Sequence, residues 1–428
     1  MTARIDADKV TEQLKPGMTV FVAGGTAEPG SILEALGRNP ARCAGVRFVS
    51  VSIPGINRVD FANFHPDAKC TAFFATPENR ESIASGRIDF VPLHYRAIYD
   101  YLATDLTVDV VLAQLPEPGD AAAVSLGINA DFLPAVLDKA GLVIAELNAS
   151  QPVPVDAPTM PASRLDFAVA CERPLPLIPD GRVGETAQQI GRHVAQLVDD
   201  GDCIQIGIGG IPRAILGALE QKNDLGFHSG LISDAVMVLA ENGNINGRQK
   251  KVDRDKIVTA TTLGGQALID WVGTTPLLRF RPVSYTHDAA VIRQLDNFVS
   301  INSALEVDLF GQVNADMLAG RQLSGTGGAV DMMRGAAMSR GGRSIVALSA
   351  TASRGKKSRI VAALNRHTAT TALRTDVDYV VTEHGARRLR HLPVQARAAA
   401  LIEIVAPQFR DELREQWRAL STTGDAAQ

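Results

Sequence analysis

A glycine-rich loop follows a predicted strand and leads into a helix, and it reads Gly207-Ile208-Gly209-Gly210-Ile211-Pro212. Its glycines let the backbone approach a ligand closely, and the free N–H groups of a helix beginning near Pro212 favour an anion. The spacing resembles a dinucleotide-binding fingerprint only loosely, because no acidic residue follows cleanly about twenty positions later. We predict that the loop binds an anionic group, with an ordinary glycine turn as the alternative.

A second glycine cluster offers similar chemistry and reads Ser324-Gly325-Thr326-Gly327-Gly328. Its successive backbone N–H groups can form a nest for a phosphate, a carboxylate or a developing oxyanion. Farther along, residues 353–359 place several cations around a glycine. Such a run is usually a solvated loop, but it also suits the phosphates of a large anionic cofactor, and we predict Lys356 in that role.

These loops need a scaffold, and the rest of the chain predicts an α/β fold. Near-continuous β-branched runs alternate with helical stretches, as expected for parallel strands buried on both faces. The predicted strands include Thr19–Ala23, Val108–Ala113, Gly141–Glu146, Asp202–Ile206, Lys256–Ala260 and Ser344–Leu348. The fold class is therefore α/β, with largely parallel sheets.

An internal repeat divides the chain. A helix, a turn glycine, a strand, a glycine-bearing loop and another helix occur around Gly17 and again around Gly201. A repeat with this spacing is too long for a solenoid and favours two similar domains, with chance similarity as the alternative. The proline-rich stretch 173–181 is the natural linker, so we predict domains at residues 1–180 and 185–428.

Composition excludes several classes of protein. Hydrophobic residues make up 46% and charged residues 21%, with a net charge of -4 and no large basic block, so nucleic-acid and membrane-surface partners are not expected. No apolar run approaches the roughly 18–20 residues that span a bilayer, and the first residues do not resemble a secretory signal. Four widely spaced cysteines indicate buried thiols in a reducing cytoplasm, and we expect no metal site.

Several longer segments resemble the acetyl-CoA hydrolase/transferase family, especially its 4-hydroxybutyrate CoA-transferases. The similar segments are Asn302–Val313, Ser324–Gly328 with Asp331, Gly342–Leu348, Gly207–Pro212 and Asp378–Gly385. The resemblance implies two open α/β sheets of the class I CoA-transferase type, with an acyl-CoA site where they meet. It also implies that both glycine loops and Asn302 bind coenzyme A or substrate, and that the protein forms a homodimer or another homo-oligomer.

The resemblance further implies covalent catalysis, in which a glutamate attacks the acyl-CoA carbonyl and then carries CoA as a thioester. In the similar transferases this glutamate lies in a His-Ser/Thr-Glu stretch shortly before a Ser-Asp pair. Here the stretch reads His228-Ser229-Gly230-Leu231-Ile232-Ser233-Asp234, so Gly230 stands at the nucleophile position. Glycine has no side chain, and the family mechanism cannot be carried over to this position.

Three explanations remain open. In the first explanation, another carboxylate has taken the role, and Glu28 and Asp60 are the nearest loop positions. Glu28 also suits a helix start, where its charge favours the helix dipole. Glu241-Asn242-Gly243 is better explained as a helix end. Alternatively, water activated by a base such as His228 hydrolyses the thioester, or the protein binds acyl-CoA without turnover. We predict CoA transfer between an acyl-CoA and a small carboxylic acid, with Glu28 as the nucleophile to test first and hydrolysis or simple binding as alternatives.

Overall fold

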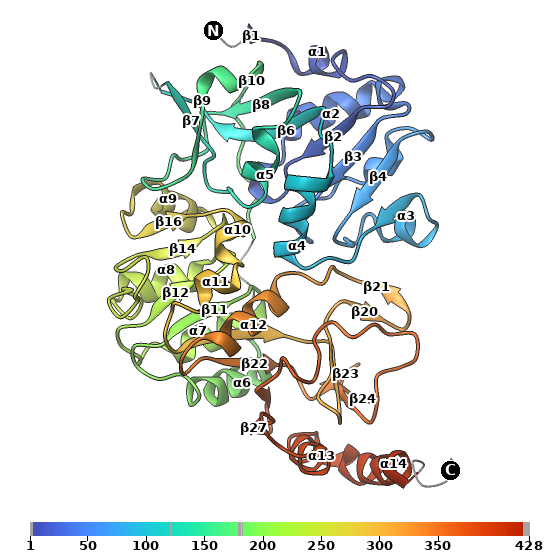
Figure 1. Cartoon of the computed structure of the whole chain (residues 1–428), viewed down its shortest axis with the longest axis vertical. Helices are drawn as coiled ribbons and strands as arrows, with labels where there is room; N and C mark the ends of the chain where they lie inside the picture. The colour runs from blue at the N-terminus through green and yellow to red at the C-terminus, as the bar shows by residue number, and fades with distance from the viewer. Residues whose placement is uncertain (1–2, 120–121, 179–180, 182, 423–428) are drawn as a thin grey trace.

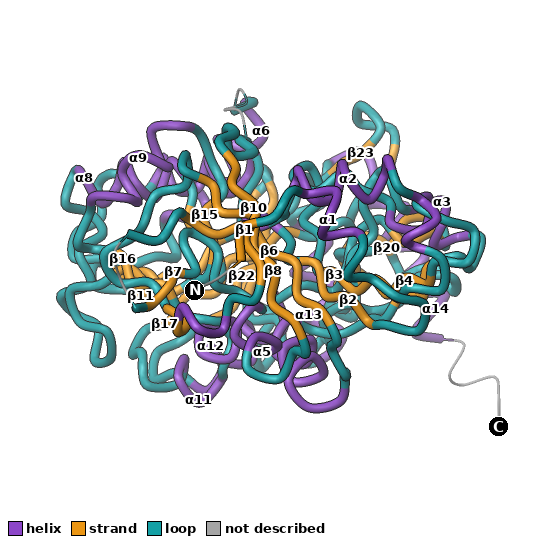
Figure 2. The backbone as a smooth tube through the Cα atoms, turned by 90° about the horizontal axis from the view of Figure 1, so that it is seen from above, coloured by secondary structure: helices purple, strands orange, loops and turns teal. Residues whose placement is uncertain are grey.

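Two eight-stranded sheets organise the computed structural model, which describes residues 3–119, 122–178, 181 and 183–422. Figure 1 shows one sheet in an upper lobe, coloured blue to green, and the other in a lower lobe that runs from green to red. From above, in Figure 2, helices lie on either side of the strands. The predicted α/β class with two similar open sheets is confirmed.

The first sheet is built from parallel strands of residues 3–171. They are β1 (Ala3–Arg4), β2 (Thr19–Val22), β3 (Arg47–Ser50), β4 (Lys69–Ala72), β5 (Ile88–Phe90), β6 (Val110–Pro116), β8 (Leu142–Asn148) and β10 (Phe167–Cys171). Their order is β1-β10-β8-β6-β2-β3-β4-β5. Every residue of β6 is buried, as expected for a strand covered on both faces.

The second sheet is built from residues 203–388 and is parallel except at one edge. Its strands are β11 (Cys203–Ile206), β12 (Gly226–His228), β14 (Ile257–Thr259), β16 (Leu278–Phe280), β17 (Phe298–Ser303), β22 (Arg343–Ala347), β26 (Tyr379–Thr382) and β27 (Gly385–Arg388). Their order is β16-β14-β12-β11-β17-β22-β26-β27, and only the edge pair β26–β27 is antiparallel among these described strands.

Both sheets have the same topology. From β2 the chain continues outward through β3, β4 and β5, and then returns to the other side of β2 as β6, β8 and β10. From β11 it continues through β12, β14 and β16, and returns as β17, β22 and β26. Gly17 and Gly201 precede the two central strands, with φ of 90° and 81°. The repeat predicted from the sequence is therefore a repeat of structure.

Helices cover both faces of each sheet. They are α1 (Ala7–Thr11), α2 (Gly30–Arg38), α3 (Arg80–Ala84), α4 (Tyr95–Asp100), α5 (Leu133–Leu137), α6 (Glu185–Ala195), α7 (Gly210–Ala218), α8 (Asp234–Glu241), α9 (Gln266–Thr274), α10 (Val283–Thr286), α11 (Ala289–Ile292), α12 (Ala329–Met338), α13 (Val394–Glu403) and α14 (Arg410–Thr422). The apolar stripe of α2 places Ile32 and Leu36 in the core of the first sheet. A Cβ at Gly191 would lie 2.5 Å from the Ala214 carbonyl oxygen, so a side chain there would prevent α6 and α7 from packing this closely. None of the described helices is long and apolar enough to cross a bilayer.

Short strands form small sheets beside the two large ones. They are β7 (Ala123–Ser125), β9 (Thr159–Pro161), β13 (Leu231–Ile232), β15 (Thr261–Thr262), β18 (Glu306–Asp308), β19 (Val313–Asn314), β20 (Met317–Leu318), β21 (Arg321–Gln322), β23 (Thr351–Ala352), β24 (Lys357–Ser358) and β25 (Ile360–Val361). The predicted buried thiols are confirmed for Cys43, Cys70 and Cys203, whereas Cys171 is half-buried. The boundary predicted between residues 180 and 185 stays a prediction, because residues 179, 180 and 182 lie outside the described residues.

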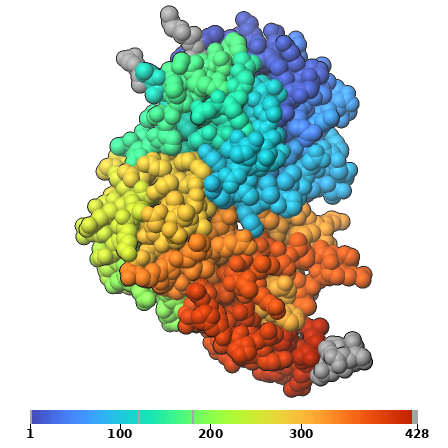
Figure 3. Space-filling view, viewed as in Figure 1, coloured from blue at the N-terminus to red at the C-terminus, as the bar shows by residue number. Residues whose placement is uncertain are grey.

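Residues 128–131 of the first half form one of the contacts that join the two halves of the chain. The Ala130 N–H donates to the Ala260 carbonyl oxygen at 2.9 Å, and the Val283 N–H donates to the Asp131 carbonyl oxygen at 2.9 Å. Figure 3 shows the halves in broad contact, with yellow and orange residues of the second half against cyan residues of the first. The backbone around Asp131 is therefore held by the half to which it does not belong.

Candidate active site

Two adjoining cavities lie between the halves. The larger, which we call the outer cavity, has a volume of about 640 Å³ and the smaller, the inner cavity, about 330 Å³. They share part of their walls, namely Pro54, Gly207, Ile208 and Leu263. A single elongated ligand can therefore occupy both.

The position of the cavities follows from the topology of the second sheet. The chain leaves β11 toward β12 but later returns on the other side of it as β17, so β11 and β17 flank a topological switch point. In open α/β sheets, ligands bind in the crevice outside the carboxyl ends of strands at such a point. Gly207 follows β11, Gly230 follows β12 and Asn302 lies near the end of β17, and all three line the inner cavity.

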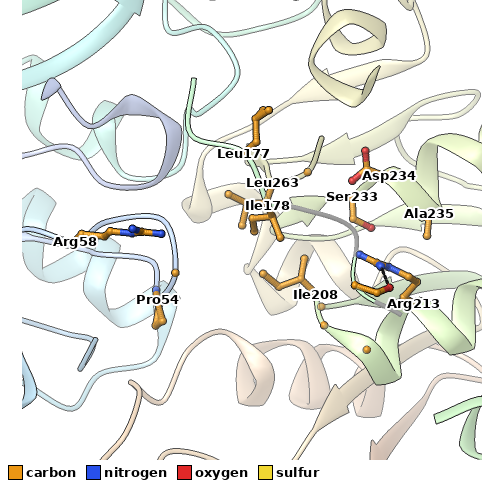
Figure 4. Close-up of a pocket in the computed structure, with 16 residues that line it drawn as sticks. Pro54, Arg58, Leu177, Ile178, Ile208, Arg213, Ser233, Asp234, Ala235 and Leu263 are labelled. Carbon is orange, nitrogen blue, oxygen red and sulfur yellow. Dashed lines mark hydrogen bonds between the residues drawn. The ribbon is translucent and has the colours of Figure 1, made fainter. Parts of the chain in front are cut away.

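The outer cavity has a wall suited to anions. Figure 4 shows Arg58 and Pro54 on one side, with Ile208, Arg213 and Ser233 on the other. Gly209, whose φ is 115°, is the residue before α7, and both Gly209 and Gly210 line the cavity. Backbone N–H groups at the start of α7 therefore face this space, which favours a phosphate.

The two arginines of the outer cavity differ in their partners. Arg213 projects from α7 and donates to the Gly181 carbonyl oxygen. Arg58 is exposed and makes no hydrogen bond or ion pair with any residue that the structure describes. Asp234 also lines this cavity, but each of its carboxylate oxygens accepts from the Gly265 N–H at 3.1 Å. Arg58 is therefore available to an anionic ligand.

The inner cavity is mainly apolar, with a polar group at the end of β17. Asn302 donates to Gln205 Oε1 at 3.1 Å and to Ser300 Oγ at 2.9 Å, which fixes its amide at the cavity wall. Gly327 and Gly328 line the same cavity. The structure thus brings together Gly207, Asn302 and the glycines Gly327 and Gly328 around one cavity.

An imidazole fills the space beside Gly230. A Cβ added at Gly230 would lie 2.5 Å from His287 Cε1, and one added at Gly328 would lie 2.2 Å from His287 Nε2. The ring lies in a notch between these two glycines and lines the inner cavity. Its Nδ1 is 2.9 Å from Thr286 Oγ1, whereas Nε2 has no hydrogen-bond partner among the described residues. Burial lowers the pKa of His287 to about 3, so the ring is neutral at neutral pH.

Asp131 places a carboxylate on the inner cavity. Its Oδ1 accepts from the Phe132 N–H at 2.6 Å, and Oδ2 accepts no hydrogen bond from the described part of the chain but is not fully enclosed. Burial raises the pKa of Asp131 to about 7. Burial, and to a smaller extent the charge of Asp131, raise the pKa of the Tyr95 hydroxyl. The Tyr95 ring centroid lies 5.1 Å from that of His287.

The carboxylates predicted as replacement nucleophiles lie elsewhere. Glu28 is half-buried and is not among the described residues that line either cavity. Burial raises its pKa to about 7, although Asn57 and Arg173 favour the charged form. Its catalytic role stays a prediction. Asp60 accepts from the Ala62 N–H at 3.0 Å and from Ser82 Oγ at 2.5 Å, as a local capping residue does.

Two further predictions can be compared with the structure. Glu241 ends α8, Asn242 caps it and Gly243 has φ of 84°, so the interpretation as a helix end is confirmed. His228 is fully buried, with Nε2 at 3.0 Å from the Thr286 carbonyl oxygen, and burial lowers its pKa to about 3. It is absent from the described lining of both cavities, so it is not placed to activate water there.

The remaining residues predicted to bind CoA do not line these cavities in the described structure. Ile211 and Pro212 belong to the first turn of α7. A Cβ at Gly325 would lie 2.2 Å from the Phe73 carbonyl oxygen, and Thr326 Oγ1 donates to the Leu93 carbonyl oxygen at 2.5 Å. These two residues join the halves. Lys356 lies in the hairpin between β23 and β24.

Sequence reasoning missed three residues of the site, namely Arg58, Asp131 and His287. Arg58 lies in the loop after β3, and Asp131 lies between β7 and α5. Each is a single polar residue in a loop without a recurring spacing. The only available signal was their placement in loops that follow strands, and that property is shared by many residues.

Comparison with known proteins identifies the family. The N-terminal domain model of acetyl-CoA hydrolase/transferase matches residues 3–179, and the C-terminal domain model matches residues 264–417. The 4-hydroxybutyrate coenzyme A transferase of Clostridium kluyveri is 35% identical over 415 residues, covering 97% of this chain and 97% of that protein. The succinyl-CoA:cyclohexane-1-carboxylate CoA transferase of Geobacter metallireducens is 33% identical, covering 83% and 82%.

Solved structures agree with these sequence matches. RipA from Yersinia pestis is 28% identical with a TM-score of 0.91, covering 98% of each chain. A 4-hydroxybutyrate CoA-transferase from Porphyromonas gingivalis is 32% identical with a TM-score of 0.82, covering 97% of each chain. The chain therefore belongs to the acetyl-CoA hydrolase/transferase family and is an enzyme that acts on acyl-CoA.

Proposed function

We propose that this enzyme transfers CoA between an acyl-CoA and a small carboxylic acid, with Gly230 at the position of the usual glutamate. The observation that supports this best is the shared wall of the two cavities. The outer cavity offers arginine and helix N–H groups to phosphates, and the inner one offers an apolar space to an acyl group. An acyl-CoA molecule has phosphates at one end and a thioester at the other.

Groups on the inner cavity match the needs of thioester chemistry. A carbonyl attacked by a nucleophile develops negative charge on oxygen, which is stabilised by fixed donors. The described second half contributes several polar residues to this lining, among them Ser229 and Asn302, together with the backbone at Gly327 and Gly328. CoA-transferases among the relatives reported above support transfer as the reaction.

Transfer is tested directly with several acyl-CoAs and with acetate, succinate or itaconate as acceptors. We expect the new acyl-CoA to appear only when an acceptor is present, with little free thiol. Steady thiol release that does not depend on the acceptor would rule out transfer as the main reaction.

Light scattering on the same preparation tests whether the enzyme is a homo-oligomer, which we propose because similar transferases suggest it.

Arg58→Gln should weaken CoA binding, because Arg58 lines the outer cavity and pairs with none of the residues that the structure describes. A hydrogen bond to a charged group contributes about 1.5–3 kcal/mol, so the dissociation constant should rise roughly tenfold or more. Calorimetry with CoA measures the effect. A short N-acetylcysteamine thioester, which lacks the phosphates, is the matched ligand and should be turned over at an unchanged rate. An equal loss for both ligands would show that Arg58 acts elsewhere.

Hydrolysis is the second function to consider, and His287 is the observation that favours it. Its neutral imidazole lies against Gly230, at the wall of the inner cavity. In such a reaction a water molecule would give a proton to Nε2 while its oxygen adds to the thioester carbonyl. The C–S bond would then break and the CoA thiolate would leave. Acetyl-CoA hydrolases also occur among the relatives, for example in Neurospora crassa at 23% identity.

His287→Gln separates the two reactions. If His287 is the base for hydrolysis, thiol release should fall, by less than the roughly 100-fold typical of a general base because an imidazole with a pKa of about 3 is a weak base, and acceptor-dependent exchange should remain. The ratio of thiol release to exchange measures this. His193→Gln on α6, away from both cavities, is the control. Unchanged thiol release in the His287 variant would show that any hydrolysis follows another route.

A further inference from the structure

One carboxylate lines the same cavity as Gly230, the position where the glutamate of the similar transferases is missing. Asp131 is the only acidic residue among the described residues that line the inner cavity, and Gly230 lines the same cavity. On the basis of the proposed transfer function, we propose that Asp131 is the catalytic residue that carries CoA covalently, in place of the absent glutamate. The carrier would then come from the first half of the chain, whereas Gly230 belongs to the second.

The backbone at Asp131 is fixed relative to the second half. The Val283 N–H donates to the Asp131 carbonyl oxygen, and the Ala130 N–H donates to the Ala260 carbonyl oxygen, both at 2.9 Å. Val283 begins α10, which is followed by His287 at the notch beside Gly230. Asp131 is therefore tied to the same elements that shape the inner cavity, and a positioned nucleophile needs such support.

The two oxygens of the carboxylate have different environments. Oδ1 accepts from the Phe132 N–H at 2.6 Å, which orients the group. Oδ2 accepts no hydrogen bond from any other described residue, and Asp131 lines the cavity, so this is the oxygen that remains for attack. Burial raises the pKa of the carboxyl to about 7. A more basic carboxylate is a better nucleophile, and a substantial part of it is still ionised at neutral pH.

The other acidic groups near the cleft lack this combination. The carboxylate of Asp234 lines the outer cavity and accepts from the Gly265 N–H through both oxygens. Asp60 accepts hydrogen bonds from its own loop and from Ser82. Glu28 does not appear in the described lining of either cavity. Position and availability together therefore favour Asp131.

The proposed reaction conserves atoms and electrons. Oδ2 of the Asp131 carboxylate adds to the acyl-CoA carbonyl, the C–S bond breaks, and a mixed anhydride and a CoA thiolate form. The thiolate then adds to the aspartyl carbonyl carbon, and the bond between that carbon and the bridging oxygen breaks, so the bridging oxygen leaves with the donor acyl group. The donor leaves as a carboxylate, and an aspartyl-CoA thioester remains. An acceptor carboxylate reverses both steps and leaves as a new acyl-CoA.

Asp131→Asn should reduce acceptor-dependent exchange by about 1,000-fold or more, since a covalent carrier cannot be replaced by an amide. CoA binding by calorimetry should persist, because the amide oxygen can still accept from the Phe132 N–H. This binding also shows that the variant is folded. The matched control is Asp138→Asn, an exposed residue just after α5. In the unmodified enzyme, exchange should rise as the pH increases through about 7, where the carboxyl ionises.

Trapping locates the carrier. Borohydride added during turnover reduces an enzyme-bound aspartyl thioester to an alcohol, and peptide mass spectrometry should place that change at Asp131. An acceptor acid with isotopically labelled oxygen should also leave label there, because its bridging oxygen stays with the aspartyl group when thiolate attacks the acceptor carbonyl. Both signals should be absent in Asp131→Asn.

The outcomes separate this inference from the proposed function. If the unmodified enzyme exchanges CoA but Asp131→Asn does so at a similar rate, the Asp131 assignment is wrong and transfer stands. Reduction or isotope at Glu28 would likewise overturn the assignment, and would support the earlier sequence prediction. If the unmodified enzyme exchanges with none of the acceptors, both the proposed function and the inference fail.

Discussion

Asp131→Asn should make the folded protein more stable above neutral pH, by up to about 3 kcal/mol, even though it removes the proposed carrier. Burial raises the pKa of Asp131 from 3.8 to about 7, so ionising it in the folded state is unfavourable. A difference of about three pKa units corresponds to about 4 kcal/mol. Asparagine carries no charge and avoids this energy, although burying its amide takes back about 1 kcal/mol.

The sign of the pH dependence follows from proton linkage. Well below about pH 4 the carboxyl is protonated in both the folded and the unfolded state, so it does not change the free energy of unfolding. As pH rises from about 4 to about 7, the unfolded chain ionises while the folded protein retains the proton, so the unmodified protein loses stability relative to the variant. The advantage of Asp131→Asn should therefore shrink by about 2 kcal/mol between about pH 8 and about pH 5.5.

Melting temperatures and urea unfolding at these two pH values measure the effect. Asp138→Asn should show no comparable change between them, because its side chain is exposed. A stability difference for Asp131→Asn that does not vary with pH would show that the carboxyl is not held in an unfavourable environment. A gain in stability together with a loss of exchange is typical of a residue retained for chemistry rather than for folding.

The sheets and their repeat could be predicted because their signals are local. Each buried strand contains its own apolar run, and Gly17 and Gly201 precede equivalent strands in left-handed conformations that glycine adopts easily. The glycine loop at Gly207–Gly210 was predictable for the same reason, since strand, glycines and helix are consecutive. Its anion-binding surface needs only the local backbone.

The rest of the site depends on contacts between distant segments. His287 and Gly230 meet only because α10 packs beside the carboxyl end of β12, and neither residue indicates the other in the sequence. Asp131 reaches the cavity because residues 128–131 pair with the opposite half. Gly325 and Thr326 have the sequence pattern of an anion-binding nest, but in the structure they pack against the first half of the chain instead. Local pattern could not distinguish these uses.

The notch between Gly230, His287 and Gly328 leads to the second large effect. Gly230→Glu alone should destabilise the protein by about 1–3 kcal/mol, because even its Cβ would lie 2.5 Å from the imidazole. The backbone is not the obstacle, since Gly230 is not among the described residues with positive φ. His287→Ala removes the ring, so the double variant should recover much of that loss. Urea unfolding of both single variants and the double variant gives the coupling, expected at about 0.5–3 kcal/mol.

The same double variant also tests whether position 230 can present a nucleophile in this cleft. Introduced into Asp131→Asn, Gly230→Glu together with His287→Ala places a carboxylate back on the inner cavity, from the loop after β12. Acceptor-dependent exchange should then return, and borohydride trapping should move to the introduced glutamate. Gly230→Gln with His287→Ala is the matched control and should stay inactive. If the glutamate variant folds and binds CoA but neither exchanges nor traps a thioester, position 230 is not where this cleft presents a nucleophile to the thioester.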